Sequence, residues 1–246
     1  LHHFNRNESL PYKVPSQAEL IHQNDSARYY TAKHMWIVQF HDLGVIIVDR
    51  LQLEMVGWVY SETVMASLLN FEDFMHPLFE LMRQEKLYAH HAGAVYDKSC
   101  GLLLAGKSGQ GKSTLSIDLF DKGFLFMSDD VCFVTDHNGS YEIIGFYEPA
   151  KVFPANVKHI GALDPWRGSG ADEHHKKPLD IRHYYPDRTK HTGPLNGIVF
   201  PVWSPREKSR REVLPPGQAL LELMPLTMVC FDPATSQAHF AFIGEL

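Results

Sequence analysis

Cysteine and long apolar runs are scarce in this sequence. Its three cysteines, Cys100, Cys132 and Cys230, lie far apart and show no Cys-x-x-Cys spacing. That pattern indicates neither a disulfide framework nor a zinc site. No apolar run approaches the length of a membrane span, and the first six residues contain no signal-peptide core. We therefore expect a cytoplasmic protein without a membrane partner. Because the sequence starts with Leu1 and not with methionine, we also expect native residues before it.

Positive charge is not concentrated anywhere in the chain. The 246 residues carry 23 lysines and arginines against 29 aspartates and glutamates, a formal net charge of −6. No long run of lysine and arginine offsets this acidic balance, so nucleic acid is not expected as the main partner. A small molecule, a peptide or a protein fits better. With 44% hydrophobic residues, the chain is long enough for one large domain or for a main domain and a smaller one.

The most informative stretch is Gly106–Ser113, which reads GKSGQGKS and matches the pattern G-x-x-x-x-G-K-[ST]. The apolar segment 101–105 precedes it and the helix-like segment 114–122 follows it. Only glycines let the backbone curl closely enough for many N–H groups to converge on one polyphosphate. The pattern therefore predicts a nucleotide-binding loop. The residues expected to bind the nucleotide are Gly106, Ser108, Gly109, Gln110, Gly111, Lys112, Ser113 and Thr114.

Two side chains of this loop have predicted chemical roles. Lys112 stands where it can reach the outer phosphates as a point charge. The hydroxyl of Ser113 stands where it can bind Mg²⁺, and the helix that begins near Lys112 adds its N-terminal dipole. The loop thus predicts a bound nucleoside triphosphate accompanied by Mg²⁺.

A pair of carboxylates, Asp129 and Asp130, directly follows the strand-like segment 124–128. One helix, one turn and one strand separate them from Lys112, so a parallel α/β arrangement would bring them beside the loop. Successive residues of a strand point to opposite sides, so we expect the two carboxylates to diverge. One would face the metal, and the other would face the acceptor hydroxyl or a nearby lysine.

Three features together resemble a known family: the loop with Ser108 at its third position, the sequence Ser128-Asp129-Asp130, and His91 upstream of the loop. Over roughly residues 88–150 they look like the catalytic domain of HPr kinase/phosphorylase. They are similar also to the smaller HPr-kinase-like serine kinases, including those of lasso-peptide gene clusters. The resemblance implies a P-loop fold related to phosphoenolpyruvate carboxykinase, ATP as donor, Mg²⁺, and a serine hydroxyl as acceptor.

The resemblance also implies roles for single residues. Asp129 would be the catalytic aspartate, which orients the acceptor hydroxyl and accepts its proton. His91 would hold Asp129 in place or stabilise charge during proton transfer, and Asp130 would assist catalysis and bind the metal together with Ser113. Thr114 stands where the bifunctional enzymes usually carry glutamate. The resemblance therefore implies the kinase reaction and leaves the reverse phosphorylase reaction open.

Hydrophobic periodicity predicts an α/β fold in two parts. Residues 1–87 form an N-terminal β-hairpin and helical portion, with strands over 35–40 and 45–49 and a short third strand near 55–60. Two consecutive helices follow, which meet at His76-Pro77 because proline rarely lies inside a helix. For residues 88–246 the resemblance implies a P-loop HPr-kinase-like catalytic domain.

Within the second part, turn residues predict hairpins that pair 92–96 with 101–105 and 131–136 with 141–146. Polar residues 164–195 read as a long loop, followed by a strand at 197–200 and a last helix at 218–224. The loop around Lys176, Lys177 and Arg182 either supplies a cation to the transferred phosphate or is an ordinary basic surface loop.

The function predicted from these features is an ATP-dependent kinase that phosphorylates a serine hydroxyl of a peptide or small protein. A lasso-peptide precursor is one candidate for the acceptor. Two alternatives stay open from the sequence: a small-molecule kinase, and a nucleotide-binding regulator that transfers nothing. Because the similar proteins often form oligomers, the resemblance also makes a homo-oligomer one expected state.

Overall fold

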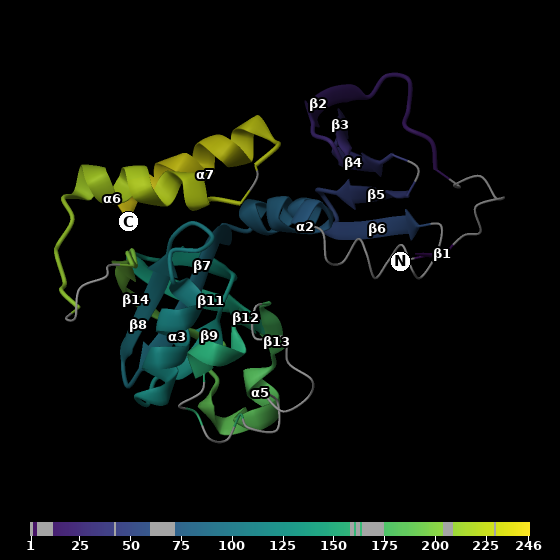
Figure 1. Cartoon of the computed structure of the whole chain (residues 1–246). Coiled ribbons are helices and arrows are strands. Elements are labelled where there is room, and N and C mark those ends of the chain that lie inside the picture. Colours follow the sequence, from purple (N-terminus) through teal and green to yellow (C-terminus); the bar gives the residue numbers. More distant parts are fainter. Residues whose placement is uncertain are drawn as a thin grey trace. The chain divides into compact units, whose positions relative to one another are not determined.

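The chain is a mixed α/β protein that divides into two compact units (Figure 1). The first unit contains residues 1–85 and 228–242, and the second contains residues 86–227 and 243–246. Within these ranges, the computed structural model describes residues 2–3, 12–41, 43–59, 72–157, 160, 163, 175–203, 209–228 and 230–246.

The first unit is built on a six-stranded sheet with the order β1-β6-β5-β4-β3-β2. Strands β2 to β6 form an antiparallel meander, and β1 pairs with β6 in parallel. The strands predicted at 35–40, 45–49 and 55–60 are confirmed as β4, β5 and β6, whereas β2 and β3 were not predicted. The strands are β1 (His2–His3), β2 (Glu19–Gln23), β3 (Arg28–Ala32), β4 (Met35–Phe40), β5 (Gly44–Asp49) and β6 (Glu54–Val59).

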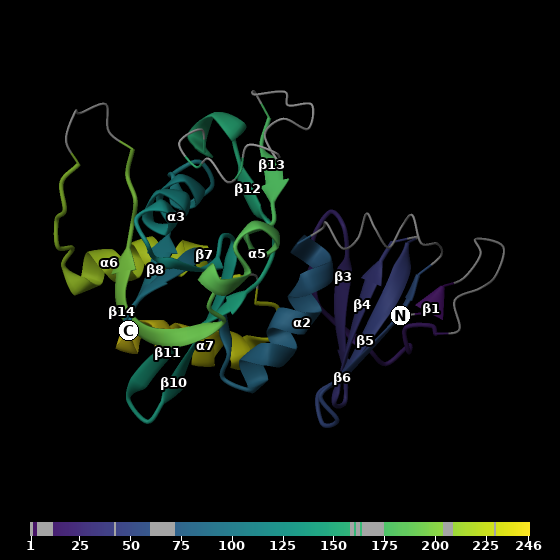
Figure 2. The same cartoon turned by 90° about the horizontal axis from the view of Figure 1, so that it is seen from below.

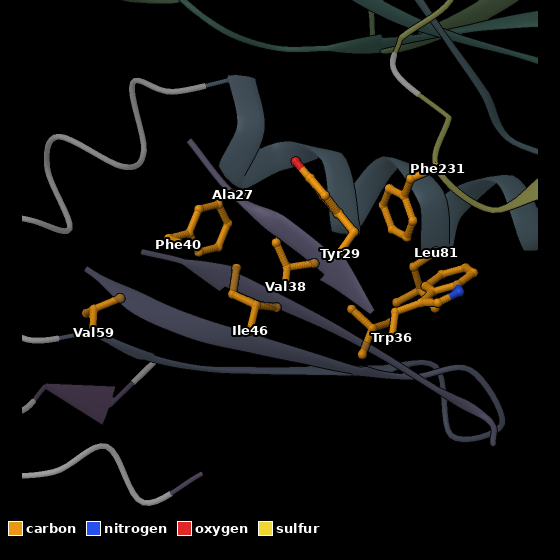
Figure 3. Packing of buried hydrophobic residues seen from close by; sticks show 10 residues of the cluster. Ala27, Tyr29, Trp36, Val38, Phe40, Ile46, Val59, Leu81 and Phe231 are labelled. Atoms are coloured by element: carbon orange, nitrogen blue, oxygen red, sulfur yellow. The ribbon is translucent and has the colours of Figure 1, made fainter. Parts of the chain in front are cut away.

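Alternation along β4 explains how this sheet buries both of its faces. Trp36, Val38 and Phe40 point to one side, where they form a cluster with Leu81 and Phe231 (Figure 3). Ile37 points to the other side and belongs to a separate cluster. The first unit therefore has its own hydrophobic core.

The helix α2 (Glu72–Gln84) corrects the prediction of two helices that meet at His76-Pro77. Pro77 lies inside α2 and costs the helix one backbone hydrogen bond. The turns that follow it bury Phe79 and Leu81, so packing of the apolar face outweighs that loss. The part of the predicted helices between residues 61 and 71 lies outside the described residues.

The second unit is built on a six-stranded mixed sheet with the order β10-β11-β14-β8-β7-β9. Figure 2 labels β7, β8, β10, β11 and β14 of this sheet. Both predicted hairpins are confirmed, as β7–β8 and β10–β11. Because β10 also pairs with β7, five of these strands form a closed ring of pairings from which β9 branches. The strands are β7 (Tyr88–Asp97), β8 (Cys100–Ala105), β9 (Leu125–Ser128), β10 (Val131–His137), β11 (Ser140–Phe146) and β14 (Thr192–Val199).

Strand direction brings two loops to the same edge of this sheet. β8 and β9 each pair with β7 in antiparallel fashion, so they run in the same direction with β7 between them. The helix α3 (Lys112–Asp121) connects β8 to β9 and packs against β7 and β8. The segments that follow β8 and β9 therefore emerge at one edge, as the sequence predicts.

The predicted loop 164–195 is wrong from residue 177 onward. That stretch contains β13 and α5, and β13 pairs with β12 to form a two-stranded ribbon. Leu179 and Ile181 are buried with Ile117 and Phe120 of α3, and elements of three or four residues are too short to show periodicity. The elements are β12 (Ala150–Val152), the 3₁₀ helix η1 (Pro154–Val157), β13 (Lys177–Leu179), α5 (Ile181–Tyr184) and the 3₁₀ helix η3 (Pro186–Arg188).

The C-terminal part of the chain is helical. The helix predicted at 218–224 is confirmed as α6 (Pro216–Leu223), which the 3₁₀ helix η4 (Met224–Leu226) follows. A further helix, α7 (Pro233–Glu245), was not predicted. The structure groups residues 228–242 with the first unit, although the sequence analysis placed them in the catalytic domain. No helix in the described part of the chain is long and apolar enough to cross a membrane.

Candidate functional site

The glycine-rich loop, residues 106–111, connects β8 to α3 and depends on glycine at particular positions. Gly109 and Gly111 have φ angles of 85° and 97°, in the left-handed region that other residues rarely adopt. At Gly106 an added Cβ would lie 2.6 Å from the Gln110 side-chain oxygen, so the Gln110 side chain would have to move. The glycines therefore set the path of the loop.

Substitution of Gly111 tests this constraint. Gly111→Ala forces a Cβ into the left-handed region, so we expect the free energy of unfolding to fall by about 1–2 kcal/mol in urea denaturation. The matched control is Gly217→Ala in α6, where an added Cβ meets no atom within 4 Å. That control should leave stability unchanged or raise it by up to about 1 kcal/mol. Equal effects of the two substitutions would contradict the assignment of strain to Gly111.

The backbone of the loop presents N–H groups that are free to bind an anion. The loop is closed by Gln110, whose backbone N–H donates to the Lys107 carbonyl at 3.2 Å and whose side-chain oxygen accepts from the Lys107 N–H. Among the described residues, no carbonyl accepts from the backbone N–H of Gly111, Lys112 or Ser113. These groups point from the N-terminus of α3, where the helix dipole also favours negative charge.

Lys112 is the first residue of α3, and its side chain is buried beneath the loop. Its ammonium group donates to the Gly106 carbonyl at 2.7 Å and lies 3.0 Å from His91 Nε2. Burial lowers the pKa of Lys112, whereas the nearby carboxylates of Asp130 and Asp129 oppose that shift. The lysine is thus a partly desolvated cation at the position where phosphate is expected.

His91 links Lys112 to Asp130. The Nδ1 atom of His91 lies 3.1 Å from Asp130 Oδ1, and its Nε2 atom faces the Lys112 ammonium group. A neutral imidazole that donates from Nδ1 to the carboxylate accepts from Lys112 at Nε2, so this arrangement satisfies all three groups. Strand β7 supplies the histidine, and Asp130 is anchored next to it because its carbonyl accepts from the Ala92 N–H at 3.0 Å.

Asp129 is the second focus of the site, and only 5% of its surface is exposed. Its Oδ2 atom accepts from Ser113 Oγ at 3.0 Å and from the Lys151 backbone N–H at 3.2 Å. Its Oδ1 atom is buried and has no hydrogen-bond partner among the described residues. Burial raises the pKa of Asp129, and the hydrogen bond from Ser113 opposes the shift. A buried acceptor without a donor fits a group that receives a proton or contacts a bound ligand.

The donor set of this site suits Mg²⁺ and not a metal that needs nitrogen or sulfur ligands. Ser113, Asp129 and Asp130 supply hydroxyl and carboxylate oxygens, and Mg²⁺ is usually held by one or two carboxylates together with water and substrate phosphates. Within the described part of the chain, no group of three or more His, Cys, Asp and Glu side chains could hold a metal alone. The residues present therefore fit a metal that arrives with a nucleotide.

The structure places the predicted site residues at one edge of the second sheet, but their side chains pair differently from the prediction. Ser113 bonds to Asp129, whereas Asp130, which the sequence analysis grouped with Ser113 as a metal ligand, pairs with His91. The roles assigned to these residues stay predictions. Ser108 is exposed on the loop. Thr114 lies one residue beyond Ser113 in α3, where it accepts a hydrogen bond from Asn156.

Two contributors to the site were missed in the sequence. The Lys151 backbone N–H reaches Asp129, and Asn156 Nδ2 donates to Thr114 Oγ1 at 3.0 Å. Both belong to the stretch formed by β12 and η1. A backbone donor has no side-chain signature, and a single asparagine in an irregular segment has none either, so no local pattern could have revealed them.

Comparison with known proteins finds a partial similarity to HPr kinases at low identity. Over 80 residues, 36% are identical to HPr kinase/phosphorylase of Mycoplasma mycoides subsp. mycoides SC, a match that covers 32% of this chain and 25% of that protein. A solved structure, the Hpr(Ser) kinase/phosphatase from Coxiella burnetii, aligns with a TM-score of 0.32 and 16% identity over 51% of this chain and 65% of that one. No family model matches the sequence. The match therefore spans about a quarter of the length of the curated relative.

Proposed function

We propose that this protein is an ATP- and Mg²⁺-dependent kinase that transfers the γ-phosphoryl group to a serine hydroxyl of a peptide or small protein. The observation that carries the proposal is the contact between Asp129 and Ser113 beside the glycine-rich loop. This contact joins a buried carboxylate to the residue that the loop pattern assigns to the metal. The Oδ1 atom of Asp129 is buried without a partner among the described residues, which supports a role in accepting a proton.

The loop and Lys112 would bind the phosphates. The backbone N–H groups at the start of α3 would surround the outer phosphates, and Lys112 would exchange its contact with the Gly106 carbonyl for a phosphate oxygen. Ser113 and Asp130 would hold Mg²⁺. Bound MgATP supplies the phosphoryl group and the metal charge that offsets its negative oxygens.

Asp129 would act on the acceptor. Its Oδ1 atom accepts the proton of the serine hydroxyl while the serine oxygen forms a bond to the γ-phosphorus. The bond from that phosphorus to the bridging oxygen breaks, and ADP leaves with the bonding electron pair. His91 holds the side chains of Lys112 and Asp130 in position through its two ring nitrogens.

The acceptor class rests on the names of the similar proteins. HPr kinase/phosphorylase and Hpr(Ser) kinase/phosphatase are both named for HPr, and the second name specifies serine. The loop, the histidine and the paired aspartates resemble those of HPr kinases, and this resemblance favours a polypeptide serine over a small molecule. A homo-oligomer and a cytoplasmic location belong to the same proposal.

The test is mass spectrometry of serine-containing peptides and small proteins incubated with this protein and MgATP. We expect a gain of one phosphate on serine that requires Mg²⁺ and disappears with EDTA. Tight ATP binding without any modified polypeptide would instead support the regulator. Transfer only to small hydroxyl compounds would support a small-molecule kinase.

The dependence of activity on pH should follow the shifted groups of the site. Asp129 must be ionised to accept a proton, so kcat/KM should fall as the pH drops through its pKa, which burial raises above the usual 3.8. Lys112 must be charged, and burial lowers its pKa from 10.5, so the alkaline limb should start at lower pH than for an exposed lysine. A profile with both limbs at the ordinary values would contradict these roles.

A further inference from the structure

The stretch 151–156 is fixed at both ends to the candidate site. At one end the Lys151 N–H donates to Asp129 Oδ2 at 3.2 Å. At the other end Asn156 donates to Thr114 in the first turn of α3 at 3.0 Å. The stretch between these bonds therefore lies along the start of α3, where the outer phosphates of a nucleotide are expected.

Lys176 lies over the middle of this stretch. Its ammonium group is 5.8 Å from the centre of the Phe153 ring, and the next residue, Lys177, pairs with Val152 in the β12–β13 ribbon. Burial is the main cause of the lowered pKa of Lys112, and the positive charge of Lys176 adds a smaller contribution in the same direction. Two cations that approach the same small volume favour an anion between them.

Lys176 is less constrained by its contacts than its basic neighbours. Its side chain is exposed, and in the described part of the chain no carboxylate forms an ion pair with it. Arg182, in contrast, stacks on the Tyr147 ring at 3.6 Å, and Lys177 is a half-buried member of β13. Of the three basic residues predicted near the nucleotide, Lys176 is therefore the one placed to reach it.

We propose that Lys176 contacts the phosphoryl group in transit, opposite Lys112, and stabilises the negative charge on its oxygens during transfer. This inference rests on the proposed function, because it needs a nucleotide on the glycine-rich loop. Lys176 neither gives nor takes a proton; it supplies a cation from outside the loop, at the end of the phosphate chain where the acceptor enters. Lys176, which directly precedes β13, is then part of the active site and not of an ordinary surface loop.

The test compares nucleotides that differ in the γ-phosphate. Calorimetry measures the binding of MgATP, MgADP and MgADP with aluminium fluoride to wild type and to Lys176→Met, which keeps the chain length and removes the charge. We expect Lys176→Met to weaken binding of ATP and of the aluminium fluoride complex about tenfold. Binding of ADP should change by less than about twofold, and Lys176→Arg should retain most of the affinity.

The matched control is Lys177→Met, which removes the neighbouring charge and should change none of the three affinities by more than about twofold. Equal losses for ATP and ADP, or an equal effect of Lys177→Met, would overturn the assignment of Lys176. If the wild type binds all three ligands and Lys176→Met binds them with unchanged affinity, only this inference fails. If the wild type binds none of them, the proposed function fails as well.

Discussion

Asp129→Asn is expected to lower kcat for phosphoryl transfer by about 10²–10⁴-fold, because it removes the group that accepts the proton of the acceptor hydroxyl. The amide keeps the shape of the carboxylate, and its oxygen can still accept from Ser113 Oγ and from the Lys151 N–H. Binding of MgATP should change far less than kcat. Single-turnover transfer to the identified acceptor, measured alongside nucleotide affinity, separates these two effects.

The same substitution should not weaken the fold. Burial raises the pKa of Asp129, which means that ionisation of this carboxyl group is less favourable in the folded protein than in the unfolded chain. At neutral pH that difference opposes folding, so a neutral amide should leave the stability unchanged or increase it. A stable Asp129→Asn variant without activity would show a carboxylate kept for chemistry at the expense of stability.

A control keeps this result specific. Asp187→Asn removes an exposed aspartate of η3 in the same unit and should leave kcat and stability unchanged. If Asp129→Asn retains full activity, Asp129 is not the base, and the His91–Asp130 pair becomes the next group to test. If it unfolds, Asp129 holds the segment 151–156 in place and its catalytic role needs a milder variant, Asp129→Glu, whose activity then decides the assignment.

Local chemistry explains how much of the site could be predicted from the sequence. The path of the loop depends on Gly109 and Gly111, whose conformation few other residues can adopt. The spacing of the glycines in the sequence therefore predicts the conformation of the loop. The approach of Asp129 to Ser113 follows from connectivity, since one helix and one strand return the chain to the same sheet edge. The sequence analysis assumed neighbouring parallel strands, and it could not foresee that β7 separates β8 from β9.

Predictions failed where structure depends on contacts between distant segments. Pro77 argues locally against a continuous helix, yet the buried face that contains Phe79 and Leu81 holds α2 together across it. The β12–β13 ribbon joins segments about 25 residues apart and is fixed by the burial of Leu179 and Ile181 against α3. The pairing of Asp130 with His91 and not with Ser113 depends on side-chain directions that no spacing encodes.

A buried ion pair in the first unit carries the largest expected effect on stability. Glu80 and Arg83 of α2 are both completely buried, and Arg83 Nη1 donates to Glu80 Oε2 at 2.7 Å. Arg83 also donates to the Met228 carbonyl at 2.6 Å and to His239 Nδ1 at 3.2 Å. Glu80 accepts from the Phe231 N–H at 3.3 Å. The pair thus attaches the C-terminal stretch 228–242 to α2 within the first unit.

Arg83→Leu should lower the free energy of unfolding by about 3–5 kcal/mol, because it leaves the Glu80 carboxylate buried without its cation. The measurement is urea denaturation followed by tryptophan fluorescence, to which Trp36, packed against Phe231 in the same unit, contributes. The control Arg28→Leu removes an exposed arginine of β3 and should change stability by no more than about 0.5 kcal/mol.

The double variant Glu80→Leu/Arg83→Leu separates charge from packing. Burial raises the pKa of Glu80 even though Arg83 opposes that shift, so desolvation is the larger effect on this carboxyl group. Removing both charges should therefore recover much of the stability that Arg83→Leu loses. A double variant as unstable as the single one would mean that Arg83 stabilises the unit mainly through its hydrogen bonds to Met228 and His239. The arginine would then be buried in order to attach the C-terminal stretch and not in order to neutralise Glu80.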